Sequence, residues 1–155
     1  SYLFTYFGRL HGLEDDAIEE RKDVLFDRFG IEDFREVKVG QLSTGMKQKT
    51  SIAISLVHNP DFVIFDEPTN GLDVLTARSV TEYLEELKNE GKTVIVSTHI
   101  LSVVDKLCDK VGIIINGKMK LCDTLDNVKH THPSNDLEEI FFELIKEEDE
   151  LGGTL

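Results

Sequence analysis

Residues 62–73 read FVIFDEPTNGLD, and this stretch decides the fold. Four apolar residues lead directly into two adjacent carboxylates, Asp66 and Glu67, and Pro68 comes next. A short apolar run without alternation predicts a strand covered on both faces, as in a parallel sheet. Neighbouring side chains of a strand point to opposite faces, but a turn at Pro68 would let both carboxylates face one crevice beyond the strand end.

The carboxylate pair has two interpretations. One carboxylate can hold Mg²⁺, usually through water, while the other orients or deprotonates an attacking water. The alternative is an acidic turn that merely ends a strand. His99 is a second candidate, because it follows a predicted strand at 93–97 and so stands at a carboxyl-terminal strand edge, where an imidazole can contact a terminal phosphate. Taken alone, such a histidine is a hydrogen-bonded loop residue.

A third candidate lies upstream, in residues 42–48, which read LSTGMKQ. A helix is predicted to begin at Ser43 or Thr44 and to end before Asn59-Pro60, because proline disfavours helix at the residue before it. The free N–H groups and the positive dipole end of that helix predict an anion site. Without other signals, Ser43, Thr44 and Gly45 form an ordinary helix cap.

Hydrophobic periodicity predicts the remaining elements. Two amphipathic helices open the chain and end near Gly12 and at Gly30, and residues 31–41 are expected to form a loop. Their expected inward residues are Leu3, Phe7 and Leu10 with Phe4 in the first helix, and Ile18, Val24, Leu25 and Phe29 in the second. Downstream, strand and helix alternate, which predicts right-handed crossovers and a mostly parallel sheet. The expected elements are strands 62–65 and 93–97, helices 76–90 and 100–108, strands 111–115 and 119–122 joined at Asn116-Gly117, and a last helix around 137–145.

Composition and charge limit the classes of protein to which the chain can belong. The 155 residues suffice for one domain with a core, and 30 acidic against 17 basic residues give a net charge of −13. This charge disfavours nonspecific nucleic-acid binding. Cys108 and Cys122 show no metal-ligand spacing and are expected to be reduced packing residues. No apolar run approaches the ~20 residues that cross a bilayer, so a membrane role is expected to act through a partner.

A phosphate-binding glycine loop is absent from the sequence. Gly91-Lys92-Thr93 resembles the end of the motif G-x-x-x-x-G-K-[ST], but the position of its first glycine is occupied by Glu86. A P-loop also runs from strand to helix, whereas here a helix precedes and a strand follows. We therefore interpret residues 91–93 as a helix-to-strand turn.

Together, four motifs resemble those of an ATP-binding-cassette (ABC) ATPase domain. Residues 42–46 are similar to the family's L-S-G-G-Q signature, with Thr44 and Met46 as departures, and residues 62–67 resemble its Walker B strand with the catalytic glutamate. Residues 70–73 look like the D-loop, and residues 97–99 like the switch-histidine loop. The resemblance implies an α/β fold, part of a P-loop NTPase (RecA-like) parallel sheet preceded by a helical subdomain. It divides the chain into a helical subdomain (1–57), the carboxyl-terminal part of the RecA-like core (58–128), and an extension helix with an acidic tail (129–155).

The resemblance also implies site roles and partners. Asp66 would help to place Mg²⁺, Glu67 would polarise the attacking water, and His99 would hold the γ-phosphate. Ser43, Thr44 and Gly45 would contact the ATP of a second, head-to-tail cassette, and Asp73 would couple the two sites. The expected partners are that second ATPase domain and transmembrane permease subunits, with no nucleic acid, at the cytoplasmic face of the cell membrane.

Three functions are consistent with these motifs. The leading one is the ATPase subunit of a membrane transporter, most simply an exporter. Because the Walker A segment is missing, we expect the sequence to be a piece of a longer protein. We also expect that this piece alone neither binds ATP tightly nor hydrolyses it. The alternatives are a soluble ABC ATPase acting on ribosomes or DNA, and a non-catalytic interaction module. Uncovered apolar surfaces would make the fragment self-associate.

Overall fold

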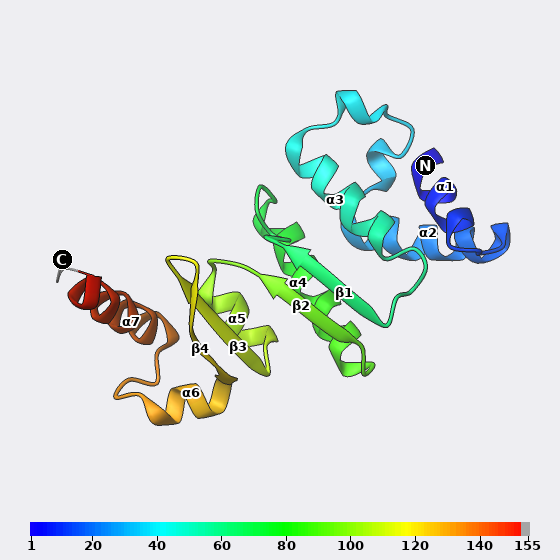
Figure 1. The fold of residues 1–155 in the computed structure, drawn as a ribbon. Helices are drawn as coiled ribbons and strands as arrows, with labels where there is room; N and C mark the ends of the chain where they lie inside the picture. Colours follow the sequence, from blue (N-terminus) through cyan, green and yellow to red (C-terminus); the bar gives the residue numbers. More distant parts are fainter. Residues whose placement is uncertain (153–155) are drawn as a thin grey trace. The chain divides into compact units, whose positions relative to one another are not determined.

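The computed structural model describes residues 1–152, and its side chains through residue 148 (Figure 1). The chain separates into two compact units, Ser1–Ser97 and a second that begins at Thr98. We describe each unit by itself. The predicted three-part division at residues 57 and 128 stays a prediction.

The first unit begins with three helices, α1 (Tyr2–Leu10), α2 (Asp15–Phe29) and α3 (Thr44–Ser55). Short 3₁₀ turns at Glu32–Phe34 and Val39–Gln41 lie within the predicted loop. As expected, α2 ends at Gly30, which adopts the left-handed conformation with φ 61°. The three helices bury a common apolar core of Phe4, Ile18, Leu25, Phe26, Phe29, Ile52 and Ala53.

The prediction that Leu10 and Val24 face inward is wrong. Leu10 is 65% exposed, because Phe4 and Gly8 set the buried face of α1 and the helix turns by about 200° over the two residues from Gly8 to Leu10. Val24 is 50% exposed, whereas its neighbours Leu25 and Phe26 are buried and take up the inward face of α2. Apolar spacing alone does not show which apolar residues of a helix lie on its buried side.

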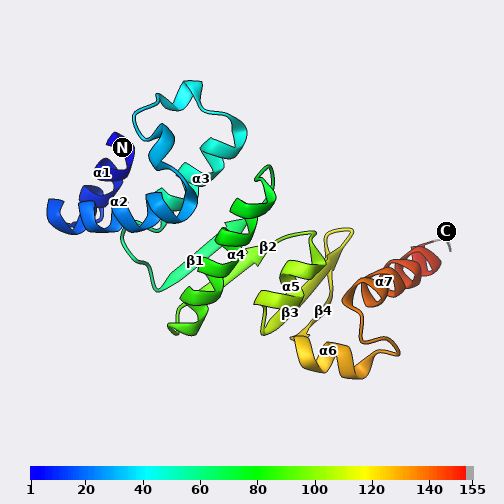
Figure 2. The same ribbon diagram turned by 180° about the vertical axis from the view of Figure 1, so that it is seen from behind.

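A parallel pair of strands forms the rest of the first unit. β1 (Phe62–Asp66) pairs with β2 (Thr93–Ser97), and α4 (Val74–Asn89) lies along one face of the pair (Figures 1 and 2). Val63 and the inward residues of α4, among them Val80 and Leu84, are buried. The predicted helix at 76–90 is therefore confirmed, with its start two residues earlier.

The other face of this strand pair is uncovered, so the prediction that β1 is covered on both faces is wrong for this chain. Phe62 is 53% exposed, Ile64 66% and Ile95 48%. Parallel pairing places these three side chains on one face, since β1 and β2 are matched as Phe62↔Thr93 and Ile64↔Ile95. We call this set the open face.

The second unit combines a hairpin with three helices, α5 (Leu101–Leu107), α6 (Leu125–Thr131) and α7 (Leu137–Gly152). β3 (Lys110–Ile115) and β4 (Lys118–Thr124) pair antiparallel around Asn116 and Gly117, whose φ values of 51° and 73° suit a type I′ turn. The predicted hairpin is thus confirmed. Its core contains Val104, Leu125, Val128, Leu137 and Ile140.

Three features of the second unit differ from the predictions. β3 pairs with β4 in a sheet of its own, so the parallel sheet of the described chain contains β1 and β2 only. The seven-residue α6 was not predicted, and α7 continues past residue 145 to Gly152. Glu148, at the start of the predicted acidic tail, forms ion pairs with Lys118 and Lys120. Of the predicted extension and tail (129–155), residues 153–155 lie outside the described residues, and so do the side chains from residue 149 on.

The described part of the chain contains no helix that is both long and apolar enough to span a bilayer. Cys108 and Cys122 are both free thiols. Cys108 packs against the apolar core of the second unit, whereas Cys122 is exposed, so the prediction that both are packing residues is wrong for Cys122.

Candidate functional site

The Asp66-Glu67 pair lies at a sharp turn at the end of β1. The strand ends with Asp66, and Glu67 has a φ of 46°, a left-handed conformation that costs a residue other than glycine about 1–3 kcal/mol. Two backbone hydrogen bonds hold it: the Glu67 N–H donates to the Ser97 carbonyl at 2.9 Å, and the Asn70 N–H donates to the Glu67 carbonyl at 3.1 Å. The predicted turn after the strand is therefore present, and it interrupts the alternation that would send the two carboxylates to opposite faces.

Asp66 contacts a residue of β2. The strand register places Asp66 opposite Ser97, and the Ser97 hydroxyl donates a hydrogen bond to Asp66 Oδ1. Both side chains share a face with Ile64 and Ile95, at the carboxyl end of the open face. Sequence reasoning did not pair Ser97 with Asp66; the signal available was that both residues end their strands.

Two buried residues follow Glu67. Pro68 is buried, and Thr69 is 7% exposed with a hydroxyl that has no hydrogen-bond partner among the described residues. A buried hydroxyl of this kind is uncommon in folded proteins. Sequence reasoning assigned Thr69 no role.

The amino-terminal end of α3 has the predicted cap. The helix begins at Thr44, and the Ser43 Oγ accepts a hydrogen bond from the Met46 N–H at 3.2 Å. Ser43 and Thr44 are exposed, so the free N–H groups of the first turn are open to an anion. The cap is confirmed, while the phosphate-contact role of Ser43, Thr44 and Gly45 stays a prediction.

The start of α3 packs against the turn that precedes α4. A Cβ atom built on Gly45 would lie 3.0 Å from the Gly71 carbonyl oxygen, and one on Gly71 would lie 3.7 Å from the Thr44 methyl group. Gly71 also has a φ of 72°, which favours glycine. The structure therefore brings together two motifs whose glycines, Gly45 and Gly71, are 26 residues apart in the sequence.

Asp73 is held by contacts within the chain. It caps α4, with Oδ1 accepting from the Thr76 N–H at 3.0 Å and Oδ2 accepting from the Thr76 hydroxyl at 2.7 Å. Lys49 Nζ on α3 lies 3.6 Å from Oδ2. These hydrogen bonds from Thr76, helped by the charge of Lys49, lower the pKa of Asp73 to about 2. Its predicted role in coupling two nucleotide sites stays a prediction.

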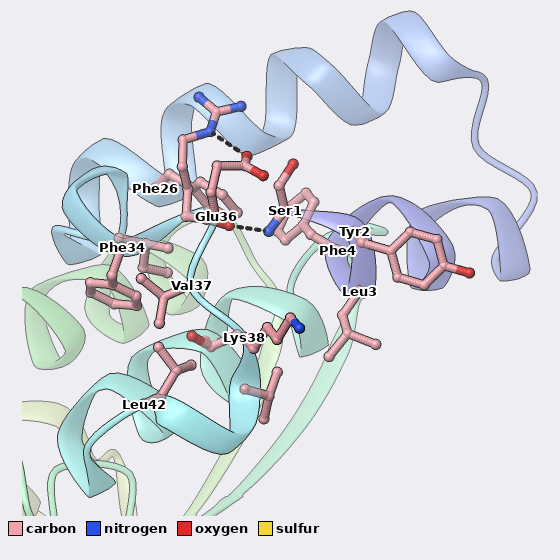
Figure 3. A pocket seen from close by; sticks show the side chains of 14 residues that line it. Ser1, Tyr2, Leu3, Phe4, Phe26, Phe34, Glu36, Val37, Lys38 and Leu42 are labelled. Carbon is pink, nitrogen blue, oxygen red and sulfur yellow. Dashed lines mark hydrogen bonds and ion pairs between the residues drawn. The ribbon is translucent and has the colours of Figure 1, made fainter.

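A pocket of about 280 Å³ lies in the helical part of the first unit (Figure 3). Its lining is mainly apolar, and Leu42, the residue before the α3 cap, forms part of its wall. All lining residues fall between 1 and 50, so this pocket is separate from the Asp66-Glu67 turn. We assign it no part in the site.

The donors at the turn fit a magnesium ion that also binds phosphate. The described residues contain no group of three or more His, Cys, Asp or Glu side chains that would hold a metal alone. Mg²⁺, however, is commonly bound by one or two carboxylates together with substrate phosphates and water. Asp66 is exposed at the strand end and offers the oxygen donor that such an ion prefers. His99 belongs to the second unit, and its predicted role stays a prediction.

Comparison with known proteins matches residues 3–105 to the family model of an AAA domain described as "putative AbiEii toxin, Type IV TA system". The ABC transporter ATP-binding protein NatA of Bacillus subtilis is 42% identical over 136 residues, which cover 88% of this chain and 55% of NatA. The lantibiotic transport ATP-binding protein SrtF of Streptococcus pyogenes is 42% identical over 117 residues, 76% of this chain and 48% of SrtF. The chain spans about half the length of these relatives.

Two solved structures have a fold similar to that of this chain. An ATP-binding subunit of an ABC transporter superposes with a TM-score of 0.85 at 31% identity, covering 93% of this chain and 61% of that one. A dimeric ATP-binding cassette bound to ADP and Pi superposes with a TM-score of 0.64 at 25% identity, covering 72% and 49%. The fold is that of P-loop NTPases. The chain belongs to the family of this AAA-domain model, and over most of its length it is similar to ABC transporter ATP-binding proteins.

Proposed function

We propose that the complete protein containing this chain hydrolyses ATP to energise transport across a membrane. The observation that supports this most directly is the Asp66-Glu67 pair, fixed in a turn at the end of a parallel strand, in a chain related to transporter ATPases. Phosphoryl transfer depends mainly on positioning and charge stabilisation, so a rigid placement of carboxylates is the feature that this chemistry needs.

Within this proposal, each site residue has one task. Asp66 holds the magnesium ion, which supplies charge stabilisation for the phosphates when it is bound. Glu67 orients the attacking water and accepts its proton. Ser43, Thr44 and Gly45 present N–H and hydroxyl groups of the α3 start to the phosphates of a second cassette. His99 contacts the terminal phosphate, and Asp73 couples the two nucleotide sites.

The partners in this proposal are a second ATPase domain and membrane-embedded permease subunits. A structural relative of this chain is dimeric, which favours a cassette pair. Export is the proposed direction, because SrtF is named for lantibiotic transport and a 38% identical relative from Sinorhizobium fredii for Nod factor export. The proposed location is the cytoplasmic face of the membrane.

The 155-residue chain alone is proposed to be inactive. It contains no G-x-x-x-x-G-K-[ST] motif, and the phosphate cradle of this fold is built from that loop. Calorimetry with MgATP on the purified chain tests this directly. Micromolar binding would overturn the proposed inactivity.

The catalytic assignment is tested by Glu67→Gln in the complete gene product. Loss of the general base is expected to lower ATP turnover by about 10²- to 10⁴-fold, while ATP-dependent dimerisation is preserved because the amide keeps the shape of the side chain. Glu90→Gln, an exposed carboxylate after α4, is the matched control and should retain turnover. Near-normal turnover in Glu67→Gln would remove Glu67 from the catalytic role.

A further inference from the structure

We propose that Ser97 is the positioning residue of this site, through its contacts with both Asp66 and Glu67. The proposal rests on the proposed ATPase function and adds a residue to it. Ser97 ends β2 directly opposite Asp66, and the two residues share a face of the strand pair. Its hydroxyl donates to Asp66 Oδ1, while its carbonyl accepts the Glu67 N–H at 2.9 Å.

These two contacts have different physical roles. The carbonyl contact secures Glu67 in a left-handed conformation that would otherwise be unfavourable for a glutamate. Any residue at position 97 provides that carbonyl, so a substitution there leaves the turn intact. The hydroxyl contact depends on the side chain, and it restrains the orientation of the Asp66 carboxylate.

The hydroxyl contact acts on metal binding rather than on folding. Asp66 and Ser97 are both exposed at the end of the open face, so water can replace the hydroxyl as a hydrogen-bond donor without leaving a buried polar group. Water does not fix the carboxylate, however. Partners that orient a ligating carboxylate typically change metal affinity by about 10- to 100-fold when they are removed. With an exposed contact, we expect the lower end of that range.

The test compares Ser97→Ala, which removes the hydroxyl, with Ser97→Thr, which keeps it on a β-branched side chain suited to a strand. Thr93→Ala is the matched control, because Thr93 lies on the same strand and face at the opposite end. In the complete gene product, ATP affinity is measured by calorimetry with Mg²⁺ and again in EDTA. A melting curve of each variant checks the fold.

The expected result is a loss confined to the metal-dependent affinity. Ser97→Ala should weaken ATP binding about tenfold in Mg²⁺ and leave it unchanged in EDTA, and Ser97→Thr and Thr93→Ala should behave as wild type. The Mg²⁺ concentration for half-maximal turnover should rise in Ser97→Ala as well. Equal affinity of Ser97→Ala and wild type in Mg²⁺ would overturn the proposal, and so would an equal loss in EDTA. If wild type itself binds ATP without any effect of Mg²⁺, the proposed function fails instead.

Discussion

A Cβ atom on Gly45 would stand 3.0 Å from the carbonyl oxygen of Gly71, so the start of α3 and the turn before α4 meet with no room for a side chain. Few carbon atoms approach a carbonyl oxygen so closely. The signature-like segment and the D-loop-like segment are therefore one packed unit within the chain. A substitution in one segment is therefore expected to displace the other segment.

Gly45→Ala should accordingly destabilise the chain and displace the Gly71 turn. We expect a loss of about 1 kcal/mol in the free energy of unfolding, the lower end for overpacking, because this contact is only half-buried. Gly40→Ala is the matched control, since a Cβ there meets nothing within 4 Å. Urea denaturation measures both variants, and equal stabilities would contradict the close packing of the two turns.

Asp73 should make the stability of the folded chain sensitive to acid through its lowered pKa. The pKa is about 2 in the folded chain and 3.8 in its ordinary range, so the stabilisation is complete above 3.8 and is lost as the pH falls from 3.8 to about 2. Asp73→Asn keeps a cap for α4 but removes this titration, so its acid unfolding curve should be flatter than that of wild type across this interval. Identical curves would show that Asp73 does not titrate as assigned.

Asp73→Ala removes the cap as well as the charge. Its melting temperature should fall by a few degrees, and further than that of Asp73→Asn, because the Thr76 N–H then loses its acceptor. Thermal unfolding followed by circular dichroism compares the two variants at neutral pH. A smaller loss for alanine than for asparagine would contradict the capping role.

His58 should make the first unit sensitive to mild acid. Its ring stacks on His11 with centroids 3.7 Å apart, and burial, followed by the nearby charges of His11, Arg21 and Lys92, lowers its pKa below 6.5. A lowered histidine pKa means that the folded chain binds fewer protons than the unfolded one, so stability is lost as the pH falls below 6.5.

The matching variant is His58→Gln, which cannot titrate. Urea unfolding at a series of pH values through 6.5 should show a steeper loss of stability for wild type than for this variant. If His58→Gln retains the full slope, another group is responsible.

The open face should make the isolated chain self-associate. Phe62, Ile64 and Ile95 form an apolar surface on two strands, and exposed apolar surfaces of this kind drive association. Ile64→Ser with Ile95→Ser should reduce association in sedimentation velocity at increasing concentration without loss of fold. A monomeric wild-type chain at high concentration would contradict the prediction.

Val63→Ser, which places a hydroxyl at a buried position, should instead destabilise the chain by about 1–3 kcal/mol.

Local signals in the sequence were sufficient for much of the fold. The hairpin at Asn116-Gly117 was predicted because both residues tolerate a positive φ, and the end of α2 at Gly30 for the same reason. The strand 62–65 and its turn were predicted from an apolar run that meets Pro68. In each case, the residues that cause the structure are neighbours in sequence.

Other features depend on partners that are distant in sequence. The short α6 escaped prediction because Leu125 and Val128 are its only buried residues, too few for a periodic signal. The open face was mistaken for a buried one, since four consecutive apolar residues do not reveal which side is covered.

The sequence by itself indicated the class of protein, because four motifs in order along the chain resemble those of ABC ATPases. Only the tertiary structure decided how these segments meet. It showed that Gly45 touches Gly71, that Asp73 is held by Thr76 and Lys49, and that Ser97 lies beside Asp66. The physical reason is that strand register and helix packing bring together residues whose spacing along the chain carries no sign of the contact.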